Sequence, residues 1–180
     1  STLHVENLKG LSSGGNANKI IVPSGQTLDA SAGTLTPSAG QIVQEVAGAT
    51  TSYSGTTSTS YVASNLSVTI TPKFSTSLII LKVFSSAYYA TGSTSGDYIY
   101  ATIYRDSTNI GVGSGYLGLY GAYGNSQNYA RPFVFGTNDS PATTSSVVYT
   151  MYFRKLASGD TGYVNDDRFQ NQIIATEIKQ

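Results

Sequence analysis

The sequence predicts an all-β protein, an antiparallel and jelly-roll-like β-sandwich that follows an extended N-terminal stalk. Two observations carry this prediction. From residue 42 onward, short segments of alternating apolar and polar residues are separated by residues that favour turns, and roughly eight to ten such strands are typical of a sandwich. No segment of this region shows a sustained helical period with capping residues. Residues 1–41, in contrast, place single apolar residues between small polar ones.

Four segments show the strand pattern most clearly. Leu66–Ile70 alternates apolar and polar residues, and Val147–Phe153 places four large side chains on one face. Tyr98–Tyr104 places three tyrosines on one face and aliphatic residues on the other. Leu78–Phe84 is nearly continuous in apolar residues, which predicts that both faces of this strand are covered. We also expect a tight turn at Arg105–Asn109 and further strands at Tyr163–Val164, at Ile173–Ile178 and at Phe133–Phe135. Pro132 requires either that this last strand lies at an edge or that the proline stands at its beginning.

Charge and composition exclude several classes of protein. The 180 residues include 10 Lys and Arg and 10 Asp and Glu, so the net charge is zero and no electrostatic footprint for nucleic acid exists. The chain contains no Cys, which excludes disulfides, thiolate zinc sites and thiol catalysis. The longest aliphatic run, Leu78–Leu81, is far shorter than the roughly 20 residues of a membrane span. The first residues show no signal-peptide pattern, and no membrane insertion is expected.

Residues 1–41 are expected to form an attachment arm and a slender stalk, separate from a head domain at residues 42–180. A short amphipathic piece at the start, with Leu3, Val5 and Leu8, would make the attachment. Isolated apolar residues then recur more regularly than in a plain Gly/Ser linker, at Ile20, Val22, Leu28, Leu35 and Ile42. They would be buried only if several copies of the chain wrap together. The alternative is a disordered linker.

Residue patterns for catalysis or cofactor binding are weak throughout the chain. The single histidine, His4, lies in the N-terminal arm, so neither a Ser-His-Asp triad nor a histidine zinc site is expected. Gly113–Gly118 matches the dinucleotide-binding glycine spacing, but a helix does not follow it. Asp160, Asp166 and Asp167 lack the regular ligand spacing of a calcium loop and are expected to cap turns, with a calcium site as the alternative, and the ten acidic residues single out no glycosidase pair. We therefore expect no enzymatic activity, no cofactor and no metal.

Tyrosine is the more informative residue type, since the chain has 14 of them and many lie beside Gly, Ser and Asn. A tyrosine combines an apolar ring with a polar tip and suits an exposed recognition surface at low entropic cost. The stretch Gly111–Asn128 is the best candidate for an exposed functional loop. The candidate ligand-binding residues are Tyr88, Tyr89, Tyr116, Tyr120, Tyr123, Asn125 and Tyr129. The alternative is that these rings pack inside the sandwich or between copies.

Four stretches of the chain resemble the β-rich C-terminal modules of fibre proteins from tailed phages, especially marine and cyanobacterial phages. In order along the chain, they are Asn65–Pro72, Ser77–Leu81, Tyr104–Gly111 and Asp139–Thr144. The start, Thr2–Leu8, is similar to the short N-terminal segment of many small fibre proteins in that group. The resemblance covers most of the chain and is least at residues 87–100 and 112–130.

The resemblance implies a virion structural protein that is usually trimeric, with its N-terminus toward the particle and its β domain outward. It carries no defined set of catalytic or binding residues onto these positions. We therefore expect a homotrimeric tail fibre or spike on the surface of a phage particle. Its arm would bind other virion proteins, and its head would contact a glycan or protein of the host surface. A capsid head fibre or decoration protein is the alternative, and a polysaccharide depolymerase is a lesser one.

Overall fold

The chain divides into two compact units, Ser1–Thr36 and Pro37–Gln180. The computed structural model describes residues 10, 12–15, 17, 19–27, 36–89, 97–111, 113, 115–122, 130–157 and 161–180. The second unit begins at Pro37, ahead of the boundary at residue 42 that the strand pattern indicates. Gly40 and Gln41 belong to it because the amide of Gly40 donates to the Lys179 carbonyl at 2.7 Å, and the amide of Lys179 donates to the Gln41 carbonyl at 3.0 Å.

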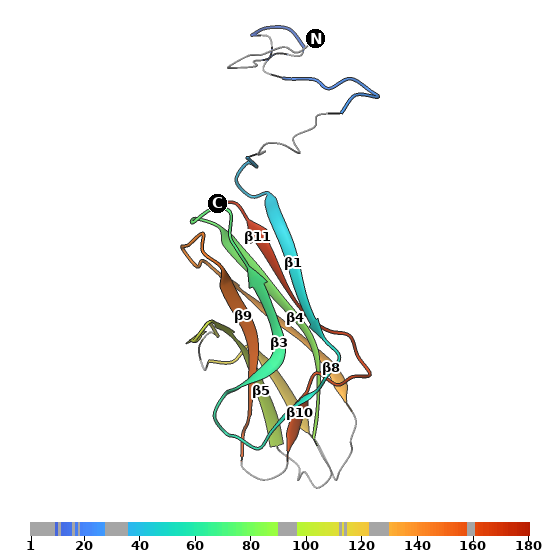
Figure 1. Cartoon of the computed structure of the whole chain (residues 1–180), viewed down its shortest axis with the longest axis vertical. Coiled ribbons are helices and arrows are strands. Elements are labelled where there is room, and N and C mark those ends of the chain that lie inside the picture. The colour runs from blue at the N-terminus through green and yellow to red at the C-terminus, as the bar shows by residue number, and fades with distance from the viewer. Residues whose placement is uncertain are drawn as a thin grey trace. The chain divides into compact units, whose positions relative to one another are not determined.

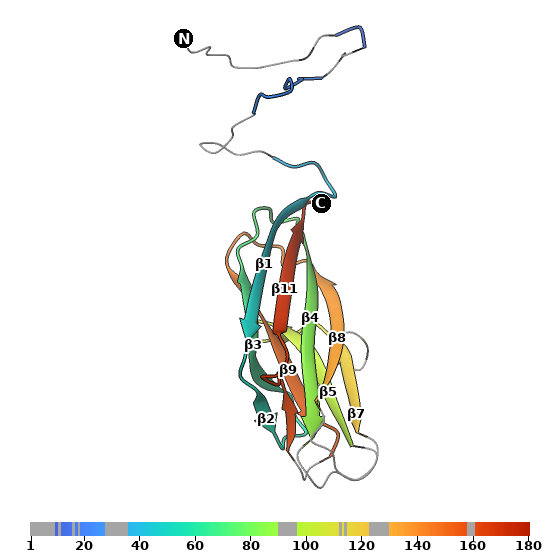
Figure 2. The ribbon, with the colours of Figure 1, turned by 90° about the vertical axis from the view of Figure 1, so that its right-hand side faces the viewer.

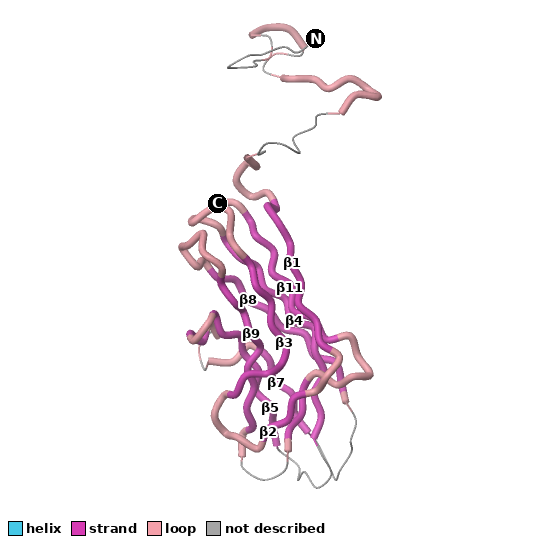
Figure 3. The backbone as a smooth tube through the Cα atoms, in the orientation of Figure 1, coloured by secondary structure: helices cyan, strands magenta, loops and turns pink. Residues whose placement is uncertain are grey.

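Two antiparallel sheets make up the second unit, and Figure 3 shows strands and loops without a helix in the described residues. The strands are β1 (Ile42–Thr50), β2 (Ser54–Thr56), β3 (Val62–Ile70), β4 (Leu78–Tyr89), β5 (Asp97–Arg105), β6 (Thr108–Asn109), β7 (Gly118–Ala122), β8 (Arg131–Asp139), β9 (Val147–Lys155), β10 (Gly162–Val164) and β11 (Asn171–Ile178). The strands named in the sequence analysis are present among them, but the extended segment expected to follow the turn at Ile110 is not a strand, because β6 ends at Asn109.

The strand order is that of a jelly roll. One sheet runs β1-β11-β4, with β8 on the other side of β4, as Figure 2 shows. The short β10 pairs with the C-terminal part of β4, and β2 pairs with β10. The other sheet runs β3-β9-β5, with β6 and β7 beside β5. Apart from the short β2, β6 and β10, eight strands remain. In their order along the chain, the first, eighth, third and sixth (β1, β11, β4 and β8) form one sheet, and the second, seventh, fourth and fifth (β3, β9, β5 and β7) form the other. This is the jelly-roll arrangement of two interlocked Greek keys.

Alternation along each strand builds the core between the two sheets. In β9 every second residue from Val147 to Lys155 is buried, and in β5 the buried apolar residues are Ile99, Ala101 and Ile103. Each fully buried aliphatic side chain contributes about 1.5–3 kcal/mol to the free energy of folding. The remaining core residues with little or no exposure include Leu66, Val68, Ile70, Ile79, Leu81, Val83, Val164, Ile173 and Ala175.

The prediction that β4 is covered on both faces is wrong for a single chain. Leu81 and Val83 point into the core, but Phe84 on the outer face keeps 39% of its surface exposed. Val134 of β8 lies directly across from Phe84 and is 63% exposed. A two-layer sandwich offers each sheet one partner, so among the described residues no other sheet covers the outer face of β4.

The predicted turn after β5 is confirmed. Tyr104 pairs with Asn109 and Arg105 with Thr108, so Asp106 and Ser107 form a two-residue connection. Asp106 has a positive φ of 51°, which aspartate tolerates better than most residues. Its amide donates to the Val148 carbonyl, and its carboxylate accepts from the Val148 amide at 3.1 Å. Pro132 also lies in an edge strand as predicted, because β8 pairs only with β4 in the described residues.

The sandwich has two distinct ends. At the proximal end, Ile42 pairs with Ile178, so β1 begins beside the end of β11 (Figure 1). At the distal end β4, β7 and β9 finish and β5, β8 and β10 begin. The connections between β4 and β5, β7 and β8, and β9 and β10 therefore all leave from the distal end.

The first unit shows turns but no helix or strand in its described residues. The amide of Ala17 donates to the Gly14 carbonyl, and the amide of Gln26 donates to the Pro23 carbonyl, both at 3.0 Å. Ile20 and Val22 are 56% and 43% exposed. Within the described part of the chain, no helix is long and apolar enough to cross a membrane.

Candidate functional site

Tyrosines gather on the outer face of the β3-β9-β5 sheet. They come from alternate positions of β5 and β9, which point away from the core, and from the segments before β3 and β7. All are half-buried in the single chain. We call this set the Tyr–Arg surface, and it consists of Tyr61, Tyr98, Tyr100, Tyr104, Tyr116, Tyr152 and Arg154.

The side chains of this surface hold one another in place. Tyr104 and Tyr152 stack with ring centroids 3.9 Å apart, and Tyr116 meets Tyr100 edge-on at 5.0 Å. The guanidinium carbon of Arg154 lies 4.3 Å from the Tyr100 ring centroid and 5.3 Å from that of Tyr61. These are distances at which cation–π attraction acts. Burial raises the pKa of the Tyr61 phenol, while the nearby Arg154 acts in the opposite direction.

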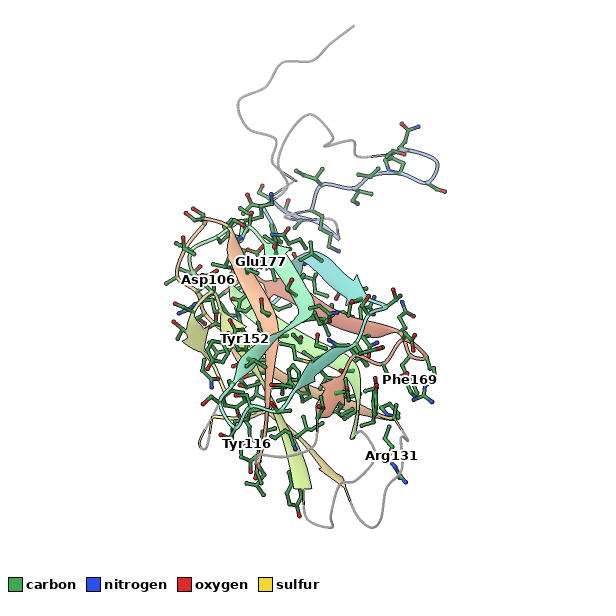
Figure 4. All side chains as sticks on the ribbon, turned by 60° about the horizontal axis from the view of Figure 1, so that its bottom comes forward. Asp106, Tyr116, Arg131, Tyr152, Phe169 and Glu177 are labelled. Carbon is green, nitrogen blue, oxygen red and sulfur yellow. The ribbon has the colours of Figure 1, made fainter. Side chains whose placement is uncertain are left out.

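The segment between β6 and β7 lies on this sheet, although the sequence suggests an exposed loop there. Thr102 on the outer face of β5 is fully buried beneath it, and its hydroxyl donates to the Asn109 side-chain oxygen at 2.8 Å. The Asn109 amide group donates to the Gly115 carbonyl at 3.0 Å. Gly111 packs so closely on Thr102 that a Cβ atom would lie 2.5 Å from the hydroxyl oxygen. This anchoring brings Tyr116 to Tyr100, and Figure 4 shows Tyr116 and Tyr152 on the same side of the sandwich.

A second, smaller group of tyrosines lies on the outer face of the other sheet, near the distal end. Tyr88 of β4 pairs across strands with Tyr163 of β10, and their rings stack at 4.8 Å. Tyr53 meets Tyr163 edge-on at 5.7 Å and is 55% exposed. Burial raises the pKa of the Tyr88 phenol, and the nearby Asp166 carboxylate raises it further. We call Tyr53, Tyr88 and Tyr163 the Tyr88 cluster.

Buried polar side chains fix the loop between β10 and β11 beside this cluster. The Ser86 hydroxyl accepts from the Asp166 amide at 2.8 Å, and the Asn171 side chain donates to the Asp166 carbonyl at the same distance. Arg168 binds both carboxylate oxygens of Asp166 at 2.8 Å, and this contact lowers the pKa of the carboxyl group. Asp166 therefore has a structural partner and is not a free ligand.

Glu177 and Asp139 also stabilise the fold. Buried Glu177 accepts from the Ser77 hydroxyl and the Gln44 side chain at 2.6 Å, and from the Lys73 amide at 2.8 Å. Burial acts to raise the pKa of Glu177, but these hydrogen bonds outweigh it and hold the pKa below its usual range. Asp139 pairs with Arg105 at 2.9 Å. Among the described residues, no three acidic or histidine side chains gather at a position that could hold a metal ion.

The structure brings together only part of the predicted ligand-binding set. Tyr88 and Tyr116 lie on different sheets, in the Tyr88 cluster and the Tyr–Arg surface. The backbones of Tyr89 and Tyr120 lie in β4 and β7. Tyr123, Asn125 and Tyr129 are outside the described residues, as are Leu3, Val5, Leu8, Leu28 and Leu35. Ile42 begins β1 and keeps 63% of its surface exposed.

Comparison with known proteins gives no family. No protein-family model matches the chain. No curated protein matches its sequence. The solved structures that it is similar to include those of the Gx and Gt strains of infectious bursal disease virus, each at 12% identity over 88% of this chain, with TM-scores of 0.42 and 0.38. The VP2 subviral particle of the same virus gives a TM-score of 0.37 at 12% identity. The chain spans less than half the length of these proteins, at 37%, 43% and 42%. At this identity and TM-score the likeness assigns no function.

Sequence reasoning missed several members of the Tyr–Arg surface. The alternation of Val147–Phe153 already places Tyr152 on the face opposite to the core residues, and Arg154 continues that face. The same alternation puts Tyr98, Tyr100 and Tyr104 on one face of β5. The missing information is the pairing of β5 with β9, which sets Arg154 directly opposite Tyr100.

Proposed function

We propose that this chain is a virion structural protein of a tailed phage, a homotrimeric tail fibre or spike whose β-sandwich contacts the host cell surface. It acts by binding and not by catalysis, and it needs no cofactor. The N-terminal arm, with Leu3, Val5 and Leu8, docks on other virion proteins. The stalk residues Ile20, Val22, Leu28, Leu35 and Ile42 pack along the three-fold axis.

The polarity of the sandwich is the observation that carries this proposal. The first strand of the sandwich begins at the proximal end and its last strand ends there, where Ile42 pairs with Ile178. Several connections between strands, among them those from β4 to β5, from β7 to β8 and from β9 to β10, leave from the distal end. A protein that is anchored through its N-terminal residues can therefore present the distal end outward. Connections carried on a rigid scaffold are where binding residues are most often found.

The exposed apolar face of the β1-β11-β4-β8 sheet supports self-association. Phe84 of β4 lies directly opposite Val134 of β8. On its other side Phe84 lies opposite Gln172 of β11, which in turn lies opposite Ala49 of β1, so these side chains form one row across the sheet. Ile174 and Ala47 pair in the adjacent row, where the exposed Lys82 of β4 lies opposite Ile174 and marks the charged border of the apolar residues. The near-continuous apolar sequence of β4 is typical of a strand covered on both faces, and a second copy would supply the missing cover. Phe84, Val134, Ala47, Ala49 and Ile174 are called the apolar face below.

The fold and the sequence resemblance contribute different support. Jelly rolls occur in viral capsid proteins, but also in lectin domains and cupins, so the fold by itself is compatible with several roles. The resemblance of Asn65–Pro72 and Tyr104–Gly111 to phage fibre modules favours the virion role. In a trimer, three weak sites on one rigid body would combine into a useful avidity for a cell surface.

Immunogold labelling of intact particles, together with an adsorption assay, tests this proposal. Antibody against the chain should label the tail, and purified full-length chain should reduce phage adsorption to host cells in a dose-dependent way. Label on the capsid would replace the tail fibre with a capsid fibre or decoration protein. Tail label without competition would remove the role in receptor binding.

A further inference from the structure

We propose that the Tyr–Arg surface binds a saccharide that carries a carboxylate. The inference rests on the proposed function, because it names the class of host-surface ligand that the sandwich contacts. It also makes a prediction for the purified chain alone. Three features of the surface support it. A cation lies among aromatic rings, the tyrosine side chains restrain one another, and an apolar partner would bury the cation without an opposite charge.

Arg154 is a cation that lies against aromatic rings. Its guanidinium lies against the rings of Tyr100 and Tyr61, and one nitrogen donates to the Lys155 carbonyl at 3.2 Å. No carboxylate among the described residues lies within ion-pair distance of it. Toward that described part of the chain most of its donors are therefore unused, and they form a fork that matches the two oxygens of a carboxylate.

The tyrosines around Arg154 suit a sugar ring. Their ring faces offer apolar surface to the C–H groups of a pyranose, and their hydroxyls both donate and accept hydrogen bonds. Tyr104 and Tyr152 are locked by mutual stacking, and Tyr116 is held by the anchored segment after β6. Because these side chains stand on paired strands and restrain one another, little conformational entropy is lost when a ligand binds.

Charge selects the ligand. The surface contains one cation, which matches the single negative charge of a sugar acid. A nucleic acid would require several cations along a backbone. A second copy of this chain is a poorer occupant. Its apolar face would bury the Arg154 guanidinium without a partner, and an unpaired buried charge is strongly unfavourable.

The test uses the full-length chain and pairs of probes that differ only in charge. The probes are trigalacturonic acid, the α-methyl glycoside of N-acetylneuraminic acid and 3-deoxy-D-manno-octulosonic acid, each compared with its methyl ester by titration calorimetry. At least one acid should bind at millimolar concentration or better, and roughly 10-fold more tightly than its ester, as expected for one charge-assisted pair. Arg154→Gln should abolish the difference between acid and ester. Arg131→Gln, which removes an exposed arginine of β8, should leave it unchanged.

Equal affinity for acids and esters overturns the inference, as does the absence of binding by all three acids. A change in the solution mass of the ligand-free chain on Arg154→Gln also overturns it, because the surface would then be an interface between copies. Failure of the proposed function gives a different result. Acid binding that survives while the chain does not compete with phage adsorption supports the site and contradicts the receptor role.

Discussion

Arg154 and Tyr100 face each other directly across the β5–β9 pair, with the guanidinium carbon 4.3 Å from the centroid of the ring. Directly opposed side chains are the strongest pairwise contacts on a sheet surface. This pair joins the end of β9 to the start of β5 at the distal end of the sandwich. Loss of either side chain should therefore destabilise the distal end as well as change the Tyr–Arg surface.

We expect Arg154→Met to lower the free energy of unfolding by about 0.5–1 kcal/mol, the strength of an exposed cation–π contact. Met keeps much of the aliphatic stem, so the loss reports on the guanidinium. In the Tyr100→Leu background the same change should cost less, because the ring is gone. Urea unfolding of the four proteins in the cycle measures the coupling. A coupling energy of zero would mean that the stacked geometry contributes nothing.

Glu177 should make the sandwich sensitive to acid. Its folded-state pKa is lowered, so it contributes stability that is fully present above its unfolded pKa of about 4.3 and is lost as the pH falls through the folded value. The melting temperature should therefore decrease as the pH falls below about 4.3. Glu177→Gln should be less stable at neutral pH by about 1–3 kcal/mol, since a neutral amide is a weaker acceptor for Ser77 and Lys73.

The acid sensitivity of Glu177→Gln provides the matched control. Its melting temperature should decrease less steeply with falling pH than that of the parent protein, while the contribution of Asp166 remains in both. Thermal unfolding followed by circular dichroism across that pH range checks this prediction. Parallel curves for the two proteins would show that another group causes the loss.

Gly48 marks a close approach between the two sheets. A Cβ atom at this position would lie 1.7 Å from the Ser67 carbonyl oxygen, which belongs to β3. Gly48→Ala should therefore force β1 away from β3 and lower the free energy of unfolding by about 1–3 kcal/mol. Gly15→Ala is the matched control, because nothing lies within 4 Å of its added Cβ. Equal melting temperatures for the two variants would contradict the packing of β1 against β3.

The apolar face should control assembly. Val134→Lys places a charge at a position that is 63% exposed in the single chain, so it should leave the fold intact and weaken association between copies. Thr69→Lys adds the same charge at an exposed position of β3, on the other sheet, and should not change the mass in solution. Sedimentation at several concentrations distinguishes the two. A Val134→Lys protein that associates like the parent would exclude this face as the interface.

The sequence predicted the strands whose alternation is clean and missed those whose alternation is broken. β5 and β9 alternate without interruption, and their inner and outer faces match the prediction. β1 was not located as a strand, because a register shift between Ile42 and Gln44 interrupts its pattern and its later positions are Ala and Gly. A bulge of this kind reverses which residues face the core, so period-2 reasoning fails there.

The candidate surfaces were harder to predict than the fold. Local alternation shows which tyrosines share a face of one strand, but not which strands are neighbours. Tyr61 and Tyr104 are far apart in the sequence and meet because β3 and β5 both flank β9. The grouping of Tyr88 with Tyr163 likewise depends on the pairing of β4 with β10. Strand order is a property of the whole topology, and no short segment encodes it.

The fibre account depends most directly on the assembly of three copies. Light scattering of the full-length chain, measured beside a chain that begins at Pro37, tests it. The account predicts a mass of three times 18.9 kDa for the full-length chain. If the shorter chain is also trimeric, the sandwich itself drives assembly; if it is not, residues 1–36 do. A monomeric full-length chain at all concentrations would contradict the account.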